Sequence, residues 1–223
     1  MSEQRPPPPR PAQGPVSWLI SLAGRIIGLV LGALILRIVL ELVGLYFWWP
    51  QEGAEHVYRV MMQEQAALAQ DLQLHPLGTR ALVLLEYGQA ELLNFQEWGY
   101  ALFRHVFPEA MLATLTHALA YALVSFMARL LRLLTTLPLF LLCATTGIAE
   151  GMMQRDLRIF GTGNESVFVH RCARKLGASV TINLWLIFLA QPMQPSSIYI
   201  LFATALWTGI VLSVTTSSFK RWL

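Results

Sequence analysis

Side chains able to carry out chemistry are few in this chain and widely spaced. No two of the five histidines stand four residues apart, as zinc ligands on one helix face do. His170 and Cys172 are two residues apart, but no second pair of metal-binding residues accompanies them. Neither a GxSxG motif nor a glycine-rich phosphate-binding loop occurs. We therefore expect no catalytic residue, no metal site, no cofactor site and no enzymatic activity.

His117 and Ser125 leave a membrane enzyme open as an alternative. The two residues lie two turns apart on one expected helix, which is too far for a direct hydrogen bond between a base and a nucleophile. A substrate-dependent activity that is lost on changing either residue would favour this alternative.

A second group of polar residues lies within apolar segments, where charge is costly and usually faces protein or water. Arg37 and Glu41 are four residues apart and can pair on one helix. Asn183 is expected to form a hydrogen bond between helices. A polar stripe at helical period comprises Thr114, His117, Tyr121, Ser125, Arg129, Arg132 and Thr136.

This stripe has two interpretations. In the first it is a structural seam, in which Arg129 or Arg132 meets Glu41 or extends to the membrane interface. In the second it lines an aqueous or ion-conducting path, and the protein is a small transporter or channel. Replacing both arginines and measuring ion flux would distinguish them.

The composition shows that charged residues are rare in this chain. Of the 223 residues, 55% are hydrophobic and only 13% are charged, about half the charged fraction of a soluble domain. Mean hydropathy is +0.52. These values exclude a disordered chain, a fibrous protein and a soluble enzyme, and two cysteines are too few for a disulfide scaffold. The net charge of +3 is too small to predict direct contact with nucleic acid.

The distribution of apolar residues predicts an all-α, polytopic membrane protein with four transmembrane helices. The first, an uncleaved signal anchor over 18–49, follows a Pro-rich tail at 1–17. The second lies within 109–149, which is about twice as long as a membrane core requires. No Gly, Pro or Asn occurs at 129–132, so we expect one long helix there rather than a hairpin. A helical hairpin, turning at Pro192 and Pro195, completes the set over 176–219.

The segment between the first two spans, 50–108, has a different character. It carries seven acidic and three basic residues and keeps a helical period of apolar positions on both sides of a break at 75–78. Two amphipathic helices of this kind cannot bury their apolar faces alone. We expect them to form a small helical periplasmic region.

Positive charge predicts the orientation, because Lys and Arg concentrate on the cytoplasmic side of short loops. With four spans and both termini in the cytoplasm, three cations fall in 50–108 and ten fall inside. The ten are Arg5, Arg10, Arg25, Arg155, Arg158, Arg171, Arg174, Lys175, Lys220 and Arg221. The inner side then comprises the tail 1–17, a basic loop at 150–175 and the C-terminus at 220–223.

Two stripes of small residues predict close helix packing, because small side chains let helix backbones approach in lipid. One stripe, on the first helix, consists of Gly24, Gly28 and Gly32. The other, on the last helix, consists of Ala205, Gly209 and Ser213, and extends to Ser217. Both are compatible with a tight bundle or with a homo-oligomer.

The segment 150–175 carries a resemblance. It reads EGMMQRDLRIFGTGNESVFVHRCARK, which resembles the integrating conjugative element membrane protein family. Thr162 and Asn164 depart from the pattern usual there. The resemblance implies a bacterial inner-membrane protein encoded near the coupling ATPase of a conjugative type IV secretion system. It supplies no catalytic residue and no established biochemical function.

Taken together, these features predict a non-enzymatic structural or accessory subunit of a conjugative secretion system. Its partners would be membrane lipid and other subunits, such as the coupling ATPase, with no direct nucleic-acid contact. The expected docking residues in the 150–175 loop are Arg155, Asp156, Arg158, Arg171, Arg174 and Lys175. The alternative role for these cations is anchoring at an anionic lipid surface, worth about 1 kcal/mol per cation.

Overall fold

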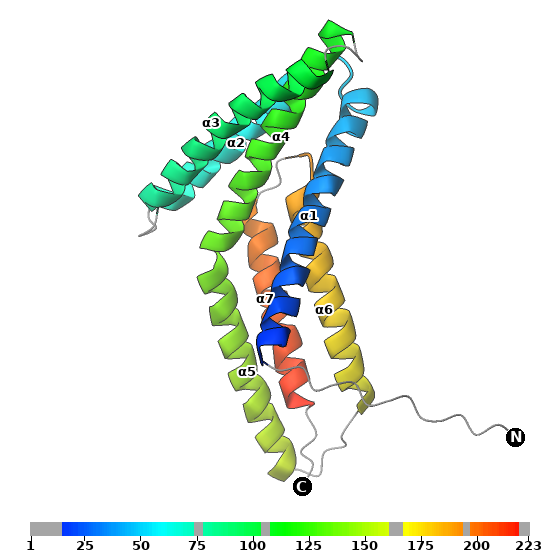
Figure 1. Ribbon diagram of the computed structural model, residues 1–223. Coiled ribbons are helices and arrows are strands. Elements are labelled where there is room, and N and C mark those ends of the chain that lie inside the picture. The colour runs from blue at the N-terminus through cyan, green and yellow to red at the C-terminus, as the bar shows by residue number, and fades with distance from the viewer. Residues whose placement is uncertain (1–14, 74–77, 104–107, 161–166, 194–196, 219–223) are drawn as a thin grey trace, which may run out of the picture.

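A computed structural model shows an all-α protein, as predicted (Figure 1). It describes the chain except for residues 1–14, 74–77, 104–107, 161–166, 194–196 and 219–223, and the described part contains no strand. The helices are α1 (Pro15–Phe47), α2 (Ala54–Gln73), α3 (Gly78–Phe103), α4 (Glu109–Thr135), α5 (Leu137–Phe160), α6 (Val167–Ala190) and α7 (Ser197–Ser217).

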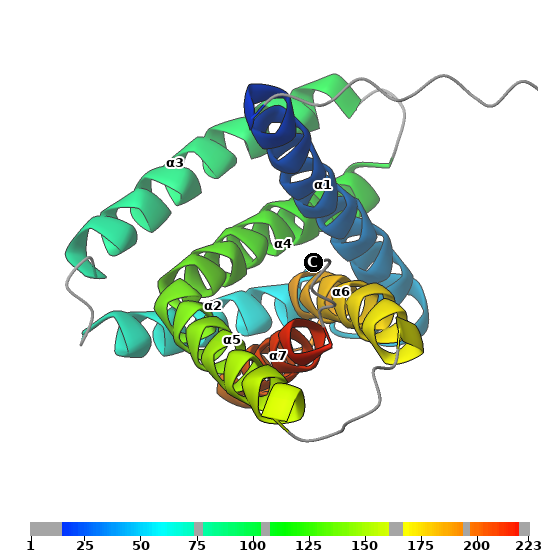
Figure 2. The same ribbon diagram turned by 90° about the horizontal axis from the view of Figure 1, so that it is seen from below.

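The helices form two groups that meet along α4 (Figures 1 and 2). A bundle contains α5, α6 and α7, with α1 packed on α6. A three-helix layer contains α2, α3 and α4, and its α2–α3 pair projects to one side of the bundle. Because α4 also packs on α1, it joins the two groups.

The turn between α1 and α2 is closed by backbone hydrogen bonds. The N–H groups of Trp48 and Trp49 both donate to the carbonyl of Gly44, at 2.9 and 2.8 Å. Gly53 has a φ of 55°, a left-handed conformation that favours glycine. The chain therefore reverses tightly from the bundle into the three-helix layer.

The segment expected as one long helix over 109–149 is divided at Thr136. The helix runs through Arg129–Arg132 without a turn, and the break coincides with Pro138, which has no N–H to continue the ladder. The Thr136 N–H still donates to the carbonyl of Arg132 at 3.1 Å. The two helices follow each other in one general direction and do not fold back as a hairpin (Figure 1).

Within the described residues, four helical segments are long and apolar enough to cross a membrane: Leu19–Phe47, Met111–Thr135, Leu137–Leu157 and Tyr199–Ser217. A shorter apolar segment, Lys175–Ala190, lies in α6. From the sequence we expected one span within 109–149 and another in the first half of 176–219. The described structure has two candidate spans in the first of these segments and only the shorter apolar segment in α6. Together α4 and α5 are roughly 75 Å long at 1.5 Å per residue, more than twice a hydrocarbon core of about 30 Å.

The main apolar core lies where α1, α4, α5, α6 and α7 meet. Its fully buried residues include Ala33, Phe126, Phe188, Leu189 and Ala205. Smaller clusters join the three-helix layer, with Leu68 and Leu72 of α2 packed around Ala128 of α4. The side of α4 that carries Ser125, Arg129 and Arg132 is therefore covered by other helices, whereas Met127 and Leu134 of α4 remain exposed.

Candidate functional site

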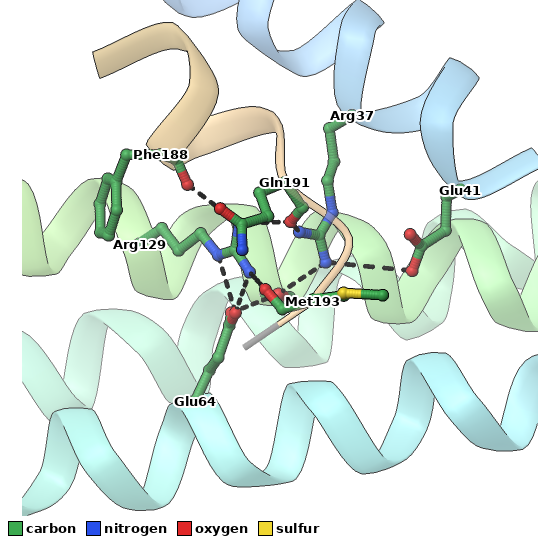
Figure 3. Close-up of polar contacts among 8 residues, drawn as sticks. Arg37, Glu41, Glu64, Arg129, Phe188, Gln191 and Met193 are labelled. Atoms are coloured by element: carbon green, nitrogen blue, oxygen red, sulfur yellow. Dashed lines mark hydrogen bonds and ion pairs between the residues drawn. The ribbon is translucent and has the colours of Figure 1, made fainter. Parts of the chain in front are cut away.

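The part of the polar stripe formed by Ser125, Arg129 and Arg132 is buried between α4, α1, α2 and the end of α6, whereas Thr114 and His117 are exposed. Ser125 is 0% exposed, Arg129 2% and Arg132 5%. Arg37 and Glu41 of α1 are equally buried, and Glu64 of α2 lies opposite them. We call Arg37, Glu41, Glu64, Ser125 and Arg129, with the carbonyls at the end of α6, the charged junction (Figure 3).

Arg129 is the central residue of the charged junction. Its Nε donates to Glu64 Oε1 at 2.7 Å, and its Nη2 pairs with the same carboxylate. Its Nη1 donates to the carbonyl of Phe188 at 2.9 Å and its Nη2 to that of Met193 at 2.8 Å. The last carbonyls of a helix lack partners within the helix and carry partial negative charge. Arg129 therefore satisfies the C-terminal end of α6 and a buried carboxylate at the same time.

Arg37 extends the network to α1. Its Nη2 donates to Ser125 Oγ at 3.1 Å, and its Nη1 donates to the carbonyl of Gln191. The Ser125 hydroxyl in turn donates to Glu64. Two arginines and two glutamates give the charged junction no net formal charge, which reduces the cost of burying it.

Glu41 is the least satisfied member. It is 2% exposed, and its Oε1 lies 3.9 Å from Arg37 Nη2. Within the described part of the chain neither of its carboxylate oxygens accepts a hydrogen bond. Arg37 and Glu41 thus pair at i,i+4 in the way their spacing suggested, but through charge alone.

A second ion pair lies near the end of α4. Arg132 Nε is 2.9 Å from Asp71 Oδ2 of α2. The Asp71 side chain is 35% exposed, so this pair borders solvent whereas the charged junction does not. Neither Arg129 nor Arg132 has its ion pair with Glu41, the partner that the structural-seam interpretation named.

Glu64 and Asp71 were missed as sites by sequence reasoning. Yet Glu64 occupies the helical position between Met61 and Leu68 on the apolar face of α2, and all three are buried. A charged residue in an apolar stripe indicates a partner across the interface. The sequence could not show that the carbonyls at the end of α6 are partners of Arg129, because every helix ends with carbonyls that lack partners.

The remaining polar candidates lie apart from the charged junction. Asn183 is exposed on α6. The His117 ring stacks near that of Tyr121, with centroids 6.0 Å apart, while Ser125 is engaged by Arg37 and Glu64. Among the described residues, no group of three or more His, Cys, Asp or Glu side chains is arranged to hold a metal ion.

The two small-residue stripes have different surroundings. A Cβ added to Gly209 would lie 2.8 Å from the Cys143 carbonyl oxygen, and one added to Gly147 would lie 2.2 Å from the Gly209 carbonyl oxygen. A Cβ at Gly151 would lie 2.6 Å from the Ser213 carbonyl oxygen. We call this contact the α5–α7 seam, and Ala205, fully buried, lies on the same helix.

The stripe on α1 is open. A Cβ added at Gly24, Gly28 or Gly32 would meet nothing within 4 Å. The sequence predicted both stripes. It did not predict Gly147 and Gly151 as the partners of the α7 stripe, because the pattern on one helix does not show which other helix packs against it.

The expected docking residues are only partly described. The segment 150–175 is mostly helical, since α5 continues to Phe160 and α6 begins at Val167. Arg155 Nε lies 3.7 Å from Asp156 Oδ1, and Lys175 is exposed near the start of α6. The side chains of Arg158, Arg171 and Arg174 lie outside the described residues.

Comparison with protein families identifies the chain at the level of a family. A model described as "IncC plasmid conjugative DNA transfer protein DtrJ-like" matches residues 94–220, more than half of the chain. No curated protein and no solved structure shows a significant match. The prediction of a conjugation-related family is confirmed. The matched residues include Arg129 and the α5–α7 seam, and by this match the chain belongs to the DtrJ-like family of conjugative DNA transfer proteins.

Proposed function

We propose that this protein is a non-enzymatic inner-membrane accessory subunit of a conjugative type IV secretion system, of the kind carried by integrating conjugative elements, and that it associates with the coupling ATPase. Family membership carries this proposal, since the family implies an accessory role in conjugative DNA transfer. Association with the transfer machinery follows from that role. The ATPase is the partner suggested by the resemblance of segment 150–175.

In the proposed placement, α1, α5, α6 and α7 cross the inner membrane and the three-helix layer faces the periplasm. The combined length of α4 and α5 supports this, because only one of them fits in the core. The end of α5, the start of α6 and the end of α7 lie at the same end of the bundle (Figure 1). Most of the cations are near that end in sequence, which supports a cytoplasmic location for it.

The charged junction supports a structural role. Its arginines are engaged by carboxylates, a hydroxyl and helix-end carbonyls, and the group is buried. Such a network fixes the three-helix layer to the bundle at one point. A catalytic site, by contrast, requires an accessible group that can contact a substrate.

Affinity purification from detergent-solubilised donor-cell membranes tests the ATPase association. The tagged chain is expected to recover the coupling ATPase, detected by immunoblot. Changing Arg155→Glu with Lys175→Glu is expected to reduce the recovery about fivefold, because both cations lie at the proposed cytoplasmic end. Arg59→Glu with Arg80→Glu, on the proposed periplasmic side, is the matched control and should leave recovery unchanged. Recovery of the chain alone would contradict the proposal.

Orientation is tested by reporter fusions. Alkaline phosphatase is active only in the periplasm, so a fusion after Gly163 should be inactive and one after Gln51 should be active. The reverse pattern would overturn the proposed placement.

A further inference from the structure

Two cavities lie end to end along one side of α4. The first, of about 170 Å³, lies between α3 and α4 and is lined by Leu84, Gly88, Leu130 and Leu134, among others. The second, of about 230 Å³, lies between α2 and α4 and is lined by residues that include Tyr58, Met62, Gln65 and Tyr121. Both are lined by Gln89 and Val124, so they lie next to each other, and we call the two cavities together the α4 trough.

We propose that the α4 trough binds an acyl chain of a phospholipid from the periplasmic leaflet. This inference rests on the proposed membrane placement, but it concerns a site that the accessory role does not require. Four features of the α4 trough support it: its length, its width, its lining and the surface onto which it opens.

The length of the α4 trough matches a long acyl chain. The α4 residues that line it extend from Ala120 to Leu134. At 1.5 Å per residue this is roughly 21 Å, the length of an extended long-chain acyl group.

The two cavities are small compared with a helix. A helix about 10 Å in diameter and as long as the α4 trough occupies roughly 1,600 Å³. The two cavities hold about 170 and 230 Å³. Cavities of this size suit a narrow hydrocarbon chain better than a helix of a partner subunit.

The lining is apolar over most of the α4 trough, with no charged side chain, and its polar groups suit an ester. The side-chain amides of Gln65 and Gln89 are the clearest of these. Gln65 Nε2 is buried and has no hydrogen-bond partner among the described residues. A buried donor without a partner is costly, and a carbonyl oxygen of an ester linkage would satisfy it.

The other end of the α4 trough opens onto the apolar surface of the proposed span. Leu134 is 54% exposed, and the next helix continues with exposed Leu137, Leu141 and Leu142. Figure 1 shows α4 passing into α5 beneath the α2–α3 pair. A lipid whose ester lies near Gln65 can thus direct its chain along α4 toward the hydrocarbon core.

Photo-crosslinking in liposomes tests this site. The full chain is reconstituted in phosphatidylethanolamine and phosphatidylglycerol with a trace of phosphatidylethanolamine that carries a diazirine on its acyl chain. Mass spectrometry of the crosslinked peptides should find label on 84–89 and 124–134, in addition to the exposed apolar residues of α5.

Gly88→Trp should fill the α4 trough, because a Cβ there meets nothing within 4 Å. We expect trough labelling to fall at least fivefold while labelling of α5 stays constant. Gly28→Trp, at an equally open glycine of α1, is the control and should leave trough labelling unchanged. Circular dichroism should show that both variants keep their helical content.

Gln65→Leu removes the side-chain amide and tests whether it binds the ester of the lipid. Labelling by the diazirine phospholipid should fall about threefold, whereas labelling by a diazirine alkane, which has no ester, should not fall. Label on α5 but not on the α4 trough would overturn the lipid site and leave the membrane placement intact. Trough label that Gly88→Trp does not reduce would also overturn it. An absence of label on α5 and α7 alike would instead overturn the placement itself.

Discussion

The charged junction and the α5–α7 seam hold helices together by opposite means. In the seam, three glycines, Gly147, Gly151 and Gly209, bring backbones so close that no side chain fits between them. In the junction, long charged side chains extend across the gaps between four helices. Small residues are sufficient where two helices run side by side over their length, whereas arginines are needed where a helix ends and exposes its carbonyls. The geometry of the contact therefore determines its chemistry.

Arg129→Met should give the largest effect. It leaves Glu64 buried and unpaired and removes hydrogen bonds to the carbonyls of Phe188 and Met193. We expect a loss of about 3–5 kcal/mol in the free energy of unfolding. Denaturation in detergent micelles measures it, with Arg155→Met at a surface position as the control.

The double variant Arg129→Met with Glu64→Met sharpens this prediction. It removes both charges, so we expect it to be more stable than Arg129→Met alone. A double variant that is as unstable as the sum of the single changes would show that the pair is not coupled.

Gly147→Val should have the next largest effect, because its Cβ would lie 2.2 Å from the backbone carbonyl oxygen of Gly209. Overpacking against backbone costs about 3 kcal/mol. Gly28→Val carries the same change in helix propensity without the collision. The difference between the unfolding free energies of the two variants measures the cost of the collision in the α5–α7 seam. Equal free energies would contradict close packing at Gly147.

Glu41→Gln should change stability by less than about 1 kcal/mol. Neither carboxylate oxygen accepts a hydrogen bond among the described residues, and Arg37 keeps Ser125 and Gln191 as partners. The same unfolding assay measures it. A loss as large as that of Arg129→Met would mean that Glu41 is an essential member of the junction.

Asp71→Asn should also have a small effect, of at most about 1 kcal/mol, because its pair with Arg132 borders solvent. Added salt should reduce this effect further, since exposed pairs are screened. The effect of Arg129→Met should not depend on salt. Stability measured at low and high salt therefore separates the two ion pairs of α4.

The smallest effect should be on ion flux. If α4 is a structural element, proteoliposomes of the native chain should conduct no more than empty liposomes, and replacing Arg129 and Arg132 with Gln should change nothing. A native flux that this double change abolishes, with complex assembly intact, would establish the channel alternative.

The sequence predicted features that repeat along one helix. The polar stripe of α4 and the small-residue stripe of α7 are periodic patterns. Ser125, Arg129 and Arg132 of the first stripe and Ala205 and Gly209 of the second face other helices. The sequence did not reveal which helix lies opposite. The partners of Glu64 and Gly147 are seen only in the structure, where α2 lies against α4 and α5 lies against α7.

The division of 109–149 has a different cause. The helix continues through Arg129 and Arg132, where the sequence has no Gly, Pro or Asn, and Pro138 determines the break that follows. A proline that interrupts a helix acts locally, so its position predicts the break more directly than the charged residues do. The order of the helices along the chain, by contrast, followed directly from hydropathy.

The sequential arrangement of α4 and α5 has a mechanical consequence. Only Thr136 lies between the two helices, and its N–H still bonds to Arg132. The pair behaves as a jointed rod whose joint lies beside the ion pair of Arg132 and Asp71. We therefore expect a displacement along α5 to be transmitted to α4 and, through the Arg132–Asp71 ion pair, to the α2–α3 pair.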